Sequence, residues 1–185
     1  MNTTLQTAEI DTPLGPLTLA LRGETLCAAA FSDGWARLAP GLARRFGGEA
    51  PRRDAAPARV RERFEAYFAG ELDALEALAV DPGGTPFQAR VWAALRRVPA
   101  GHTVSYTELA AAAGVPGKSR AVGAANGANP VWIAIPCHRV IGADGSPRGY
   151  AGGVPRKLWL LGHEGARRLV ITLPDLHLLG AVATP

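Results

Sequence analysis

Short apolar runs separated by turn residues fill the first thirty positions of the chain. The runs cover residues 5–10, 17–21 and 26–31, and the segments between them contain Pro, Gly and charged residues. Short strands joined by tight turns are typical of an antiparallel sheet. The N-terminus is therefore predicted to form an antiparallel meander of three strands.

Helical spacing replaces the strand pattern further along the chain. Residues 40–57 are rich in Gly, Pro and Arg and are expected to form a loop. Apolar residues then recur at intervals of three and four from Val60 to Leu75, which predicts an amphipathic helix. The segment Asp81-Pro82-Gly83-Gly84 breaks this helix and marks the expected domain boundary. The predicted divisions are an N-terminal α/β domain at residues 1–80, a C-terminal domain at residues 81–170, and a tail at residues 171–185.

Capping signals predict several helices in the C-terminal domain. Thr85 and Ser105 each begin a capping box, and the second box opens a short helix that reaches Ala113. A glycine-containing turn follows, and Ser119 is expected to cap a third helix from Arg120 to about residue 128. A final helix is expected from Pro155 to Glu164. The pattern of helix, tight turn and basic helix is that of a helix-turn-helix, although many small helical hairpins share the same shape.

These elements define the predicted fold class as α/β, of the α+β kind. A small antiparallel sheet plus helix forms the N-terminal domain, and a mainly helical domain with a helix-turn-helix forms the C-terminal one. No apolar run approaches the roughly 18 residues of a membrane span, and the N-terminus has no secretory leader. We therefore expect a cytoplasmic, monomeric protein with no membrane partner.

Charge is distributed unevenly between the two predicted domains. Residues 1–84 carry 9 Arg against 12 acidic residues, a net of −3, whereas residues 85–185 carry 11 basic against 4 acidic residues, a net of +7. A basic half beside an acidic half suggests that one part of the molecule faces a polyanion. The alternative is that the many arginines reflect genomic base composition.

Cys137 and His138 are the strongest candidates for chemistry. They follow the apolar run 131–135, which is expected to be a buried strand, in the sequence Pro136-Cys137-His138-Arg139-Val140. A thiol becomes a strong nucleophile when a histidine or a cation favours the thiolate. Adjacent residues on a strand point to opposite faces, so the chain either leaves strand geometry at Pro136 or the pair communicates through a water. The simpler alternative is that Cys137 is one more buried small residue.

Cysteine and histidine counts argue against a metal or cofactor site. Cys27 and Cys137 are the two cysteines and lie far apart, which gives neither a disulfide framework nor a zinc quartet. Ligands at the neighbouring positions 137 and 138 would point apart. We expect no metal and no cofactor, and Cys27 is expected to be buried.

Several motifs downstream of residue 85 occur in an order and spacing that a chance match would not produce. They are Ser105-Tyr106-x-x-Leu109-Ala110, Arg120-Ala121-Val122-Gly123, Asn129-Pro130, Pro136-Cys137-His138-Arg139-Val140, Gly149-Tyr150-Ala151-Gly152-Gly153 and Lys157-x-Trp159-Leu160-Leu161-x-His163-Glu164-Gly165. With these motifs the chain resembles the O6-alkylguanine-DNA alkyltransferases, also called methylated-DNA-protein-cysteine methyltransferases, in their bacterial single-chain form. The first 80 residues fit the family's more variable N-terminal domain less specifically.

The resemblance implies a suicide repair protein that acts once on double-stranded DNA containing O6-alkylguanine, and on O4 of thymine. It assigns Cys137 as the alkyl acceptor, with His138 acting through a water and Glu164 orienting the imidazole. Asn129, which would otherwise be read as a helix C-cap, would hold the turn before the cysteine, and Tyr106 would crowd a phosphate and bond the base edge.

The same resemblance implies that the target nucleotide is flipped out of the duplex, because an alkyl group on a paired base cannot reach a buried thiol. Arg120 would fill the gap left in the stack. The remaining contacts to DNA or to the base are assigned to Val140, Tyr150, Ala151, Ala121 and Gly123. Two residues depart from the family pattern and bear on substrate range. Ala151 stands where some members carry a residue with a hydroxyl group, and Trp132 occupies a position near the pocket where relatives often carry a smaller residue.

Three other functions fit parts of the pattern. A lesion sensor that binds alkylated DNA without repairing it would lack the nucleophilic cysteine, and Cys137 argues against that. A transcription regulator of the adaptive-response type would need an added cysteine-rich metal domain. A thiol hydrolase unrelated to DNA would be distinguished by an assay for peptide or ester turnover.

Overall fold

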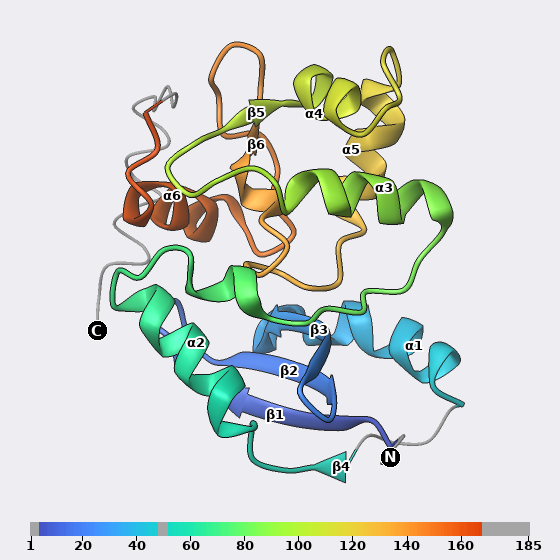
Figure 1. Cartoon of the computed structure of the whole chain (residues 1–185), viewed down its shortest axis with the longest axis vertical. Helices are drawn as coiled ribbons and strands as arrows, with labels where there is room; N and C mark the ends of the chain where they lie inside the picture. Colours follow the sequence, from blue (N-terminus) through green and yellow to red (C-terminus); the bar gives the residue numbers. More distant parts are fainter. Residues whose placement is uncertain (1–3, 48–51, 168–185) are drawn as a thin grey trace. The chain divides into compact units, whose positions relative to one another are not determined.

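The computed structural model describes residues 4–47 and 52–167, which form two compact units (Figure 1). The first unit contains the residues up to Gly83 together with Pro130–Ala134, and the second contains Gly84–Asn129 and the residues from Ile135. The segment 130–134 joins the first unit because Ala29 N donates to Pro130 O at 2.9 Å and Trp132 N donates to Ala29 O at 2.8 Å. The expected tail lies outside the described residues.

The first unit is built on a four-stranded sheet in the order β3-β2-β1-β4. Strands β1 (Gln6–Ile10), β2 (Leu17–Arg22) and β3 (Thr25–Phe31) pair antiparallel, which confirms the predicted meander. The short β4 (Arg52–Arg53) adds a parallel edge strand to β1, so the sheet is not purely antiparallel as expected. Residues on both faces of β3 are buried, and the strand therefore lies at the centre of this unit's core.

Helix α1 (Trp35–Arg45) replaces the first part of the loop expected at residues 40–57, and that prediction was wrong there. Pro40 and the following glycine are helix breakers in sequence terms, but Pro40 removes only one backbone donor. Trp35, Leu38 and Leu42 recur at intervals of three and four and pack on a cluster with residues of the sheet. Burial of this apolar face outweighs the missing hydrogen bond.

Helix α2 (Ala58–Phe68) confirms the predicted amphipathic helix but ends earlier than expected. The chain turns at Gly70, whose φ of 109° is readily adopted by glycine alone. Leu75 consequently belongs to a separate 3-10 turn, η2 (Ala74–Ala77). Beyond it, Asp81 is paired with two arginines of the same unit, so the start of the breaker segment is anchored there.

The second unit is mainly helical, as predicted. Its helices are α3 (Pro86–Leu95), α4 (Tyr106–Ala112), α5 (Ser119–Gly127) and α6 (Val154–His163). Both capping boxes are confirmed, because Thr85 and Ser105 each accept from the N3 backbone while the N3 side chain reaches back. Helices α4 and α5, joined by a turn with glycines at positive φ, form the helix-turn-helix.

Two local features of the second unit differ from the sequence expectation. Ser119 is the first residue of α5 rather than its cap, and its hydroxyl lies 3.2 Å from that of Thr107 on α4. In addition, β5 (Val104–Ser105) pairs parallel with β6 (Val140–Ile141). This pair brings the start of α4 beside the residues that follow Cys137.

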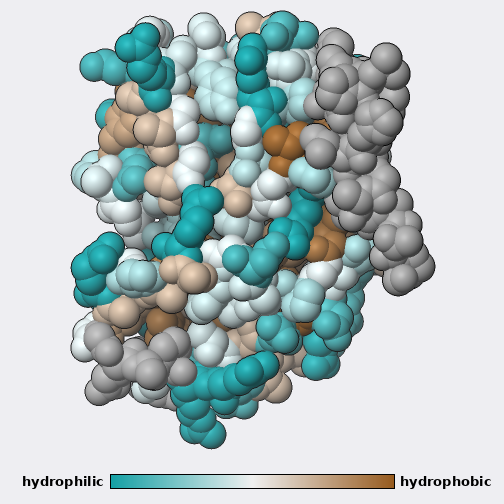
Figure 2. Space-filling view, turned by 180° about the vertical axis from the view of Figure 1, so that it is seen from behind, coloured by the Kyte–Doolittle hydropathy of each residue, from teal (hydrophilic) through white to brown (hydrophobic). Residues whose placement is uncertain are grey.

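The surface carries few strongly apolar side chains on the face that Figure 2 draws, as expected when such side chains fill the core. On the face drawn in Figure 2, hydrophilic and neutral residues predominate and strongly hydrophobic residues show as small patches. Among residues 4–47 and 52–167, no helix is both long and apolar enough to cross a membrane.

Candidate active site

The apolar run before Cys137 is a buried turn, and the expected strand at residues 131–135 was wrong. After a single bridge to β3, Ala134 N donates to Trp132 O at 2.9 Å across Ile133, whose φ is 71°. This geometry is that of a γ-turn, which is rare and strained for a β-branched residue. A short, continuous apolar run does not distinguish a buried strand from a buried turn, which explains the error.

The chain leaves extended geometry at Pro136, which resolves the alternative left open by the sequence. Pro136 has φ −80° and ψ 63°, and Cys137 N donates to Ile135 O at 2.8 Å. Cys137 then begins a 3-10 turn, η3 (Cys137–Arg139). Because the backbone turns here, the Cys137 and His138 side chains are not held on opposite faces as they would be in a strand.

His138 is completely buried and is held by Glu164 at the C-terminal end of α6. The ring Nε2 lies 2.9 Å from Glu164 Oε1. An ionised carboxylate only accepts hydrogen bonds, so Nε2 carries the proton and Nδ1 of the neutral ring carries a lone pair. Within the described part of the chain, Nδ1 has no hydrogen-bond partner. Burial lowers the pKa of His138 although Glu164 opposes this, so the ring is neutral at neutral pH and can accept a proton.

Cys137 is buried as well, with 3% of its surface exposed. Burial raises the pKa of its thiol to about 11, while a hydrogen bond with Asn129 and the charge of Lys157 act in the opposite direction. The resting side chain is therefore a thiol at neutral pH, whereas the sequence suggested a thiolate stabilised by its neighbour. A base that acts at the moment of reaction is required instead.

Two asparagines hold the turn that carries Cys137. Asn129 is 1% exposed and donates from Nδ2 to Ile135 O at 2.8 Å. Ala128, not Asn129, is the C-cap of α5, so the simpler reading of Asn129 is excluded. Asn126, which the sequence did not single out, donates from Nδ2 to Cys137 O at 3.5 Å.

Tyr106 belongs to the helix-turn-helix and lies close enough to Cys137 for charge on the sulfur to act on its phenol. It opens α4, it is half-buried, and its ring lies 3.6 Å from the place where a Cβ on Gly123 of α5 would stand. Burial raises the pKa of the Tyr106 phenol, and negative charge on Cys137 adds to this, so the hydroxyl remains a donor. Arg120 and Ala121 are exposed on the first turn of α5.

The loop before α6 contributes the remaining predicted residues. Tyr150 and Ala151 are half-buried there, and the Tyr150 ring meets the His138 ring edge-on at a centroid distance of 6.4 Å. Burial raises the pKa of Tyr150 well above its ordinary value, so this phenol is also protonated. Trp132, in contrast, belongs to the first unit, where its ring centroid lies 6.1 Å from that of Phe31.

Two buried cations of this site are absent from the site residues predicted from the sequence. Arg139 is 6% exposed and binds both carboxylate oxygens of Glu164. Lys157 is fully buried and donates from Nζ to Val140 O, and burial lowers its pKa to about 8. A signal was available, because Lys157 and Glu164 lie seven residues apart on the otherwise apolar face of α6.

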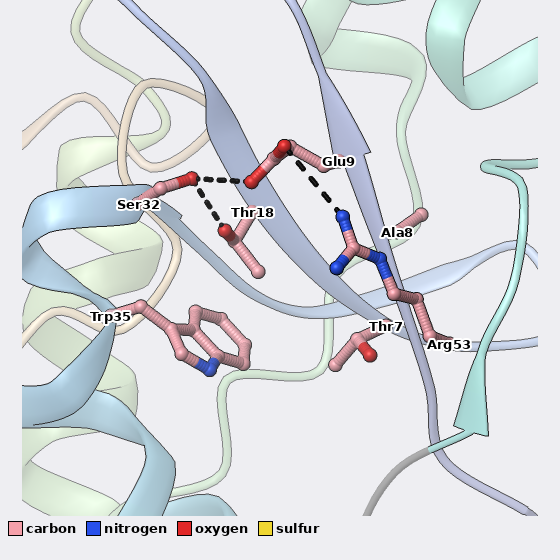
Figure 3. Close-up of a pocket in the computed structure, with 7 residues that line it drawn as sticks. All are labelled: Thr7, Ala8, Glu9, Thr18, Ser32, Trp35 and Arg53. Atoms are coloured by element: carbon pink, nitrogen blue, oxygen red, sulfur yellow. Dashed lines mark hydrogen bonds and ion pairs between the residues drawn. The ribbon is translucent and has the colours of Figure 1, made fainter.

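A separate pocket in the first unit does not share this chemistry (Figure 3). Several of its polar groups pair with one another: Ser32 Oγ donates to Glu9 Oε2 at 2.8 Å, and Arg53 lies 3.8 Å from the same carboxylate. Thr18 Oγ1 lies 2.8 Å from Ser32 Oγ, and the Trp35 indole lines one side. The pocket contains no thiol or imidazole, so the chemically competent groups are those of the second unit.

A buried thiol, a neutral imidazole fixed by a carboxylate, and a helix-turn-helix lie in one unit, which is the arrangement expected of a DNA-binding protein that uses a cysteine for group transfer. Comparison with known proteins agrees with this class. Residues 6–82 match the 6-O-methylguanine DNA methyltransferase, ribonuclease-like domain, and residues 86–166 match the 6-O-methylguanine DNA methyltransferase, DNA binding domain. The chain belongs to the 6-O-methylguanine DNA methyltransferase family, which confirms the resemblance seen in its motifs.

Individual relatives cover different shares of the chain. A methylated-DNA–protein-cysteine methyltransferase of Mycolicibacterium paratuberculosis is 44% identical over 84% of this chain and 89% of its own length. One from Salmonella typhimurium is 56% identical over 59% of this chain, and the match spans only 64% of the relative's length. The crystal structure of Mycobacterium tuberculosis OGT in complex with DNA is similar at 42% identity, with a TM-score of 0.76 over 94% of this chain and 99% of that one.

Proposed function

We propose that the protein repairs duplex DNA by moving an alkyl group from O6 of guanine to its own Cys137. The observation that carries this proposal is the buried Cys137 next to a neutral His138 that Glu164 fixes in one tautomer. The family relationship supports the same activity, since the similar Mycolicibacterium protein is a methylated-DNA–protein-cysteine methyltransferase. The O4 position of thymine carries an equivalent alkylated oxygen and is proposed as a second substrate.

The transfer is a displacement at the alkyl carbon. The Cys137 proton passes through a water to His138 Nδ1, the sulfur forms a bond to carbon, and the bond from carbon to O6 breaks. The electron pair of that bond returns to the purine, whose negative charge is stabilised by a hydrogen bond from the Tyr106 hydroxyl at the base edge. The purine then takes a proton from solvent, and His138 returns the Cys137 proton to solvent. Asn129 holds the turn so that the sulfur faces the carbon.

Charge supports DNA as the partner. Acidic groups of the described part of the second unit are each engaged within the protein: Glu108 in a capping box, Asp144 with Arg148, and Glu164 with Arg139. The basic side chains at exposed positions are Arg90, Arg97, Lys118, Arg120, Arg148 and Arg167. A surface of this kind binds phosphates without sequence preference.

Base access then requires nucleotide flipping, because Cys137 is buried. In this proposal the exposed Arg120 at the start of α5 fills the vacated position in the stack. The backbone and side chains proposed to receive the base or the adjoining DNA are those of Val140, Tyr150, Ala151, Ala121 and Gly123. A DNA substrate implies action in the cytoplasm of a bacterial cell, and a monomer suffices because every proposed group lies in one chain.

Mass spectrometry after incubation with duplex DNA containing O6-methylguanine tests this proposal directly. One methyl adduct on Cys137 is expected, with product reaching a plateau at one alkyl group per protein because a thioether offers no ready route back to a thiol. Cys137→Ala should abolish transfer and retain DNA binding, and Cys27→Ala is the matched control that should keep transfer. Methyl transfer by Cys137→Ala, or repeated turnover, would refute the assignment.

A further inference from the structure

The Arg139 guanidinium donates three hydrogen bonds inside the second unit, two to Glu164 and one to a backbone carbonyl. Its Nε donates to Glu164 Oε2 at 2.9 Å and one terminal nitrogen donates to Glu164 Oε1 at 2.8 Å. The other terminal nitrogen donates to Val98 O, just beyond α3. The guanidinium thus binds Glu164 with the planar fork that arginine alone offers, and it is fixed at its far side by a backbone carbonyl.

This arrangement determines what Glu164 can do to His138. Glu164 Oε1 is shared between His138 Nε2 and Arg139, while Oε2 accepts a second bond from Arg139. The carboxylate is therefore fixed in plane and cannot rotate away from the imidazole. Its negative charge is also balanced by a permanent cation, so it does not by itself demand a second positive charge on the ring.

We propose that Arg139 is a positioning residue for the transfer, which holds Glu164 in place and balances its charge so that His138 remains a neutral base with Nδ1 free. This inference rests on the proposed function. A carboxylate without Arg139 would favour the imidazolium, and an imidazolium has no lone pair with which to take the Cys137 proton.

The charged and titratable groups around His138 are consistent with this role. Cys137 and Arg139 flank it on η3, Glu164 and Lys157 face it from α6, and the Tyr150 ring contacts it from the preceding loop. Glu164 raises the pKa of His138, whereas Arg139, Lys157 and burial lower it. Removal of Arg139 therefore moves the His138 pKa upward.

The competing explanation is that Arg139 only ties α6 to the end of α3. The two explanations differ in pH dependence, so the test uses single-turnover alkylation of Cys137 by free O6-methylguanine base from about pH 5 to pH 9. Arg139→Gln removes the charge, and Arg139→Lys retains it without the fork. Trp92→Phe is the stability control, because it removes another buried donor to a backbone carbonyl, the 2.9 Å bond to Ala125 O, which involves neither Glu164 nor His138.

We expect Arg139→Gln to lower the ratio of the rate at pH 6 to the rate at pH 8 several-fold relative to wild type, because a higher His138 pKa reduces the neutral fraction of the ring much more at pH 6 than at pH 8. Arg139→Lys should keep the wild-type ratio while the rate at pH 8 falls, and Trp92→Phe should lower the melting temperature without changing the ratio. Superimposable ratios for Arg139→Gln and wild type, or equal changes in the Gln and Lys variants, would overturn the proposal.

A second measurement needs no variant. Nitrogen-15 NMR of the His138 ring in the wild-type protein should show a neutral imidazole protonated at Nε2 at neutral pH. An imidazolium there would overturn the role of Arg139 even if Arg139→Gln fails to fold. Absence of alkylation in the wild-type protein would instead refute the proposed function, so the two failures are distinguishable.

Discussion

Substitution of Glu164 by Gln tests the buried network through protein stability. Glu164 is 4% exposed and accepts bonds from His138 and Arg139. The amide of Gln keeps the shape but removes the charge that balances Arg139, which leaves a buried cation unpaired. Breaking a buried pair in this way costs about 3–5 kcal/mol, or roughly 6–20 °C in melting temperature for a protein of this size.

The pH dependence of this loss follows from the Glu164 pKa. His138 and Arg139 hold this pKa far below its ordinary value of 4.5 despite burial. A depressed acid contributes stability that is fully present above the unfolded-state pKa and is lost as pH falls below it. Near pH 3.5 the wild type should therefore have lost about 1.4 kcal/mol of this contribution, whereas the Gln variant has none to lose.

Urea unfolding near pH 7 and near pH 3.5, followed by circular dichroism and tryptophan fluorescence, measures both quantities. Glu62→Gln is the matched control, because Glu62 is exposed on α2 and its loss should change stability by less than about 0.5 kcal/mol. A difference below about 1 kcal/mol near pH 7, or one that stays the same at both pH values, would refute the reasoning.

Three further substitutions test other parts of the structure. Arg120→Ala should slow methyl transfer from duplex DNA more than transfer from the free base, and equal slowing in the two rate assays would make Arg120 structural. Lys157→Met should slow alkylation of Cys137 by removing the buried cation that favours the thiolate. Because the Lys157 pKa is about 8, wild-type Lys157 loses its charge above that pH, and the difference between the two alkylation rates should shrink there. Thr85→Ala should reduce the free energy of unfolding by about 1 kcal/mol in denaturant titration, since it removes the side-chain acceptor of a capping box, and an unchanged midpoint would contradict that.

Local signals in the sequence predicted local structure well. Thr85 and Ser105 start helices because a capping box needs only residues three positions apart. The meander of β1 to β3 was likewise visible, because hairpins join neighbours in the chain. Helix α1 was not, because its stability comes from packing on the sheet, which outweighs the local cost of Pro40.

The long-range geometry of the site was harder to predict from the sequence. The motif Pro136-Cys137-His138-Arg139 pointed to the segment that is proposed to react. Neither the buried turn of this segment nor the pairing of β5 with β6 produces a periodic pattern in the sequence. Arg139 meets Glu164 across 25 residues of chain. A charged residue in an apolar stripe of the sequence indicates that its side chain has a buried partner, but only the folded structure shows which residue that partner is.

The burial of Cys137 and its proposed reactivity are linked, because a buried thiol stays protonated until a base removes its proton. With a thiol pKa of about 11, only roughly one molecule in ten thousand carries a thiolate at pH 7. A standing thiolate would react with any electrophile that reached it, whereas a buried thiol reacts only where a base takes its proton as the new bond forms. In the proposed mechanism the base must be neutral at rest, which the burial of His138 and the bond from Arg139 to the Glu164 carboxylate both favour. In the proposed mechanism, burial therefore holds Cys137 as an unreactive thiol, and His138 with Glu164 and Arg139 prepares it for a single transfer.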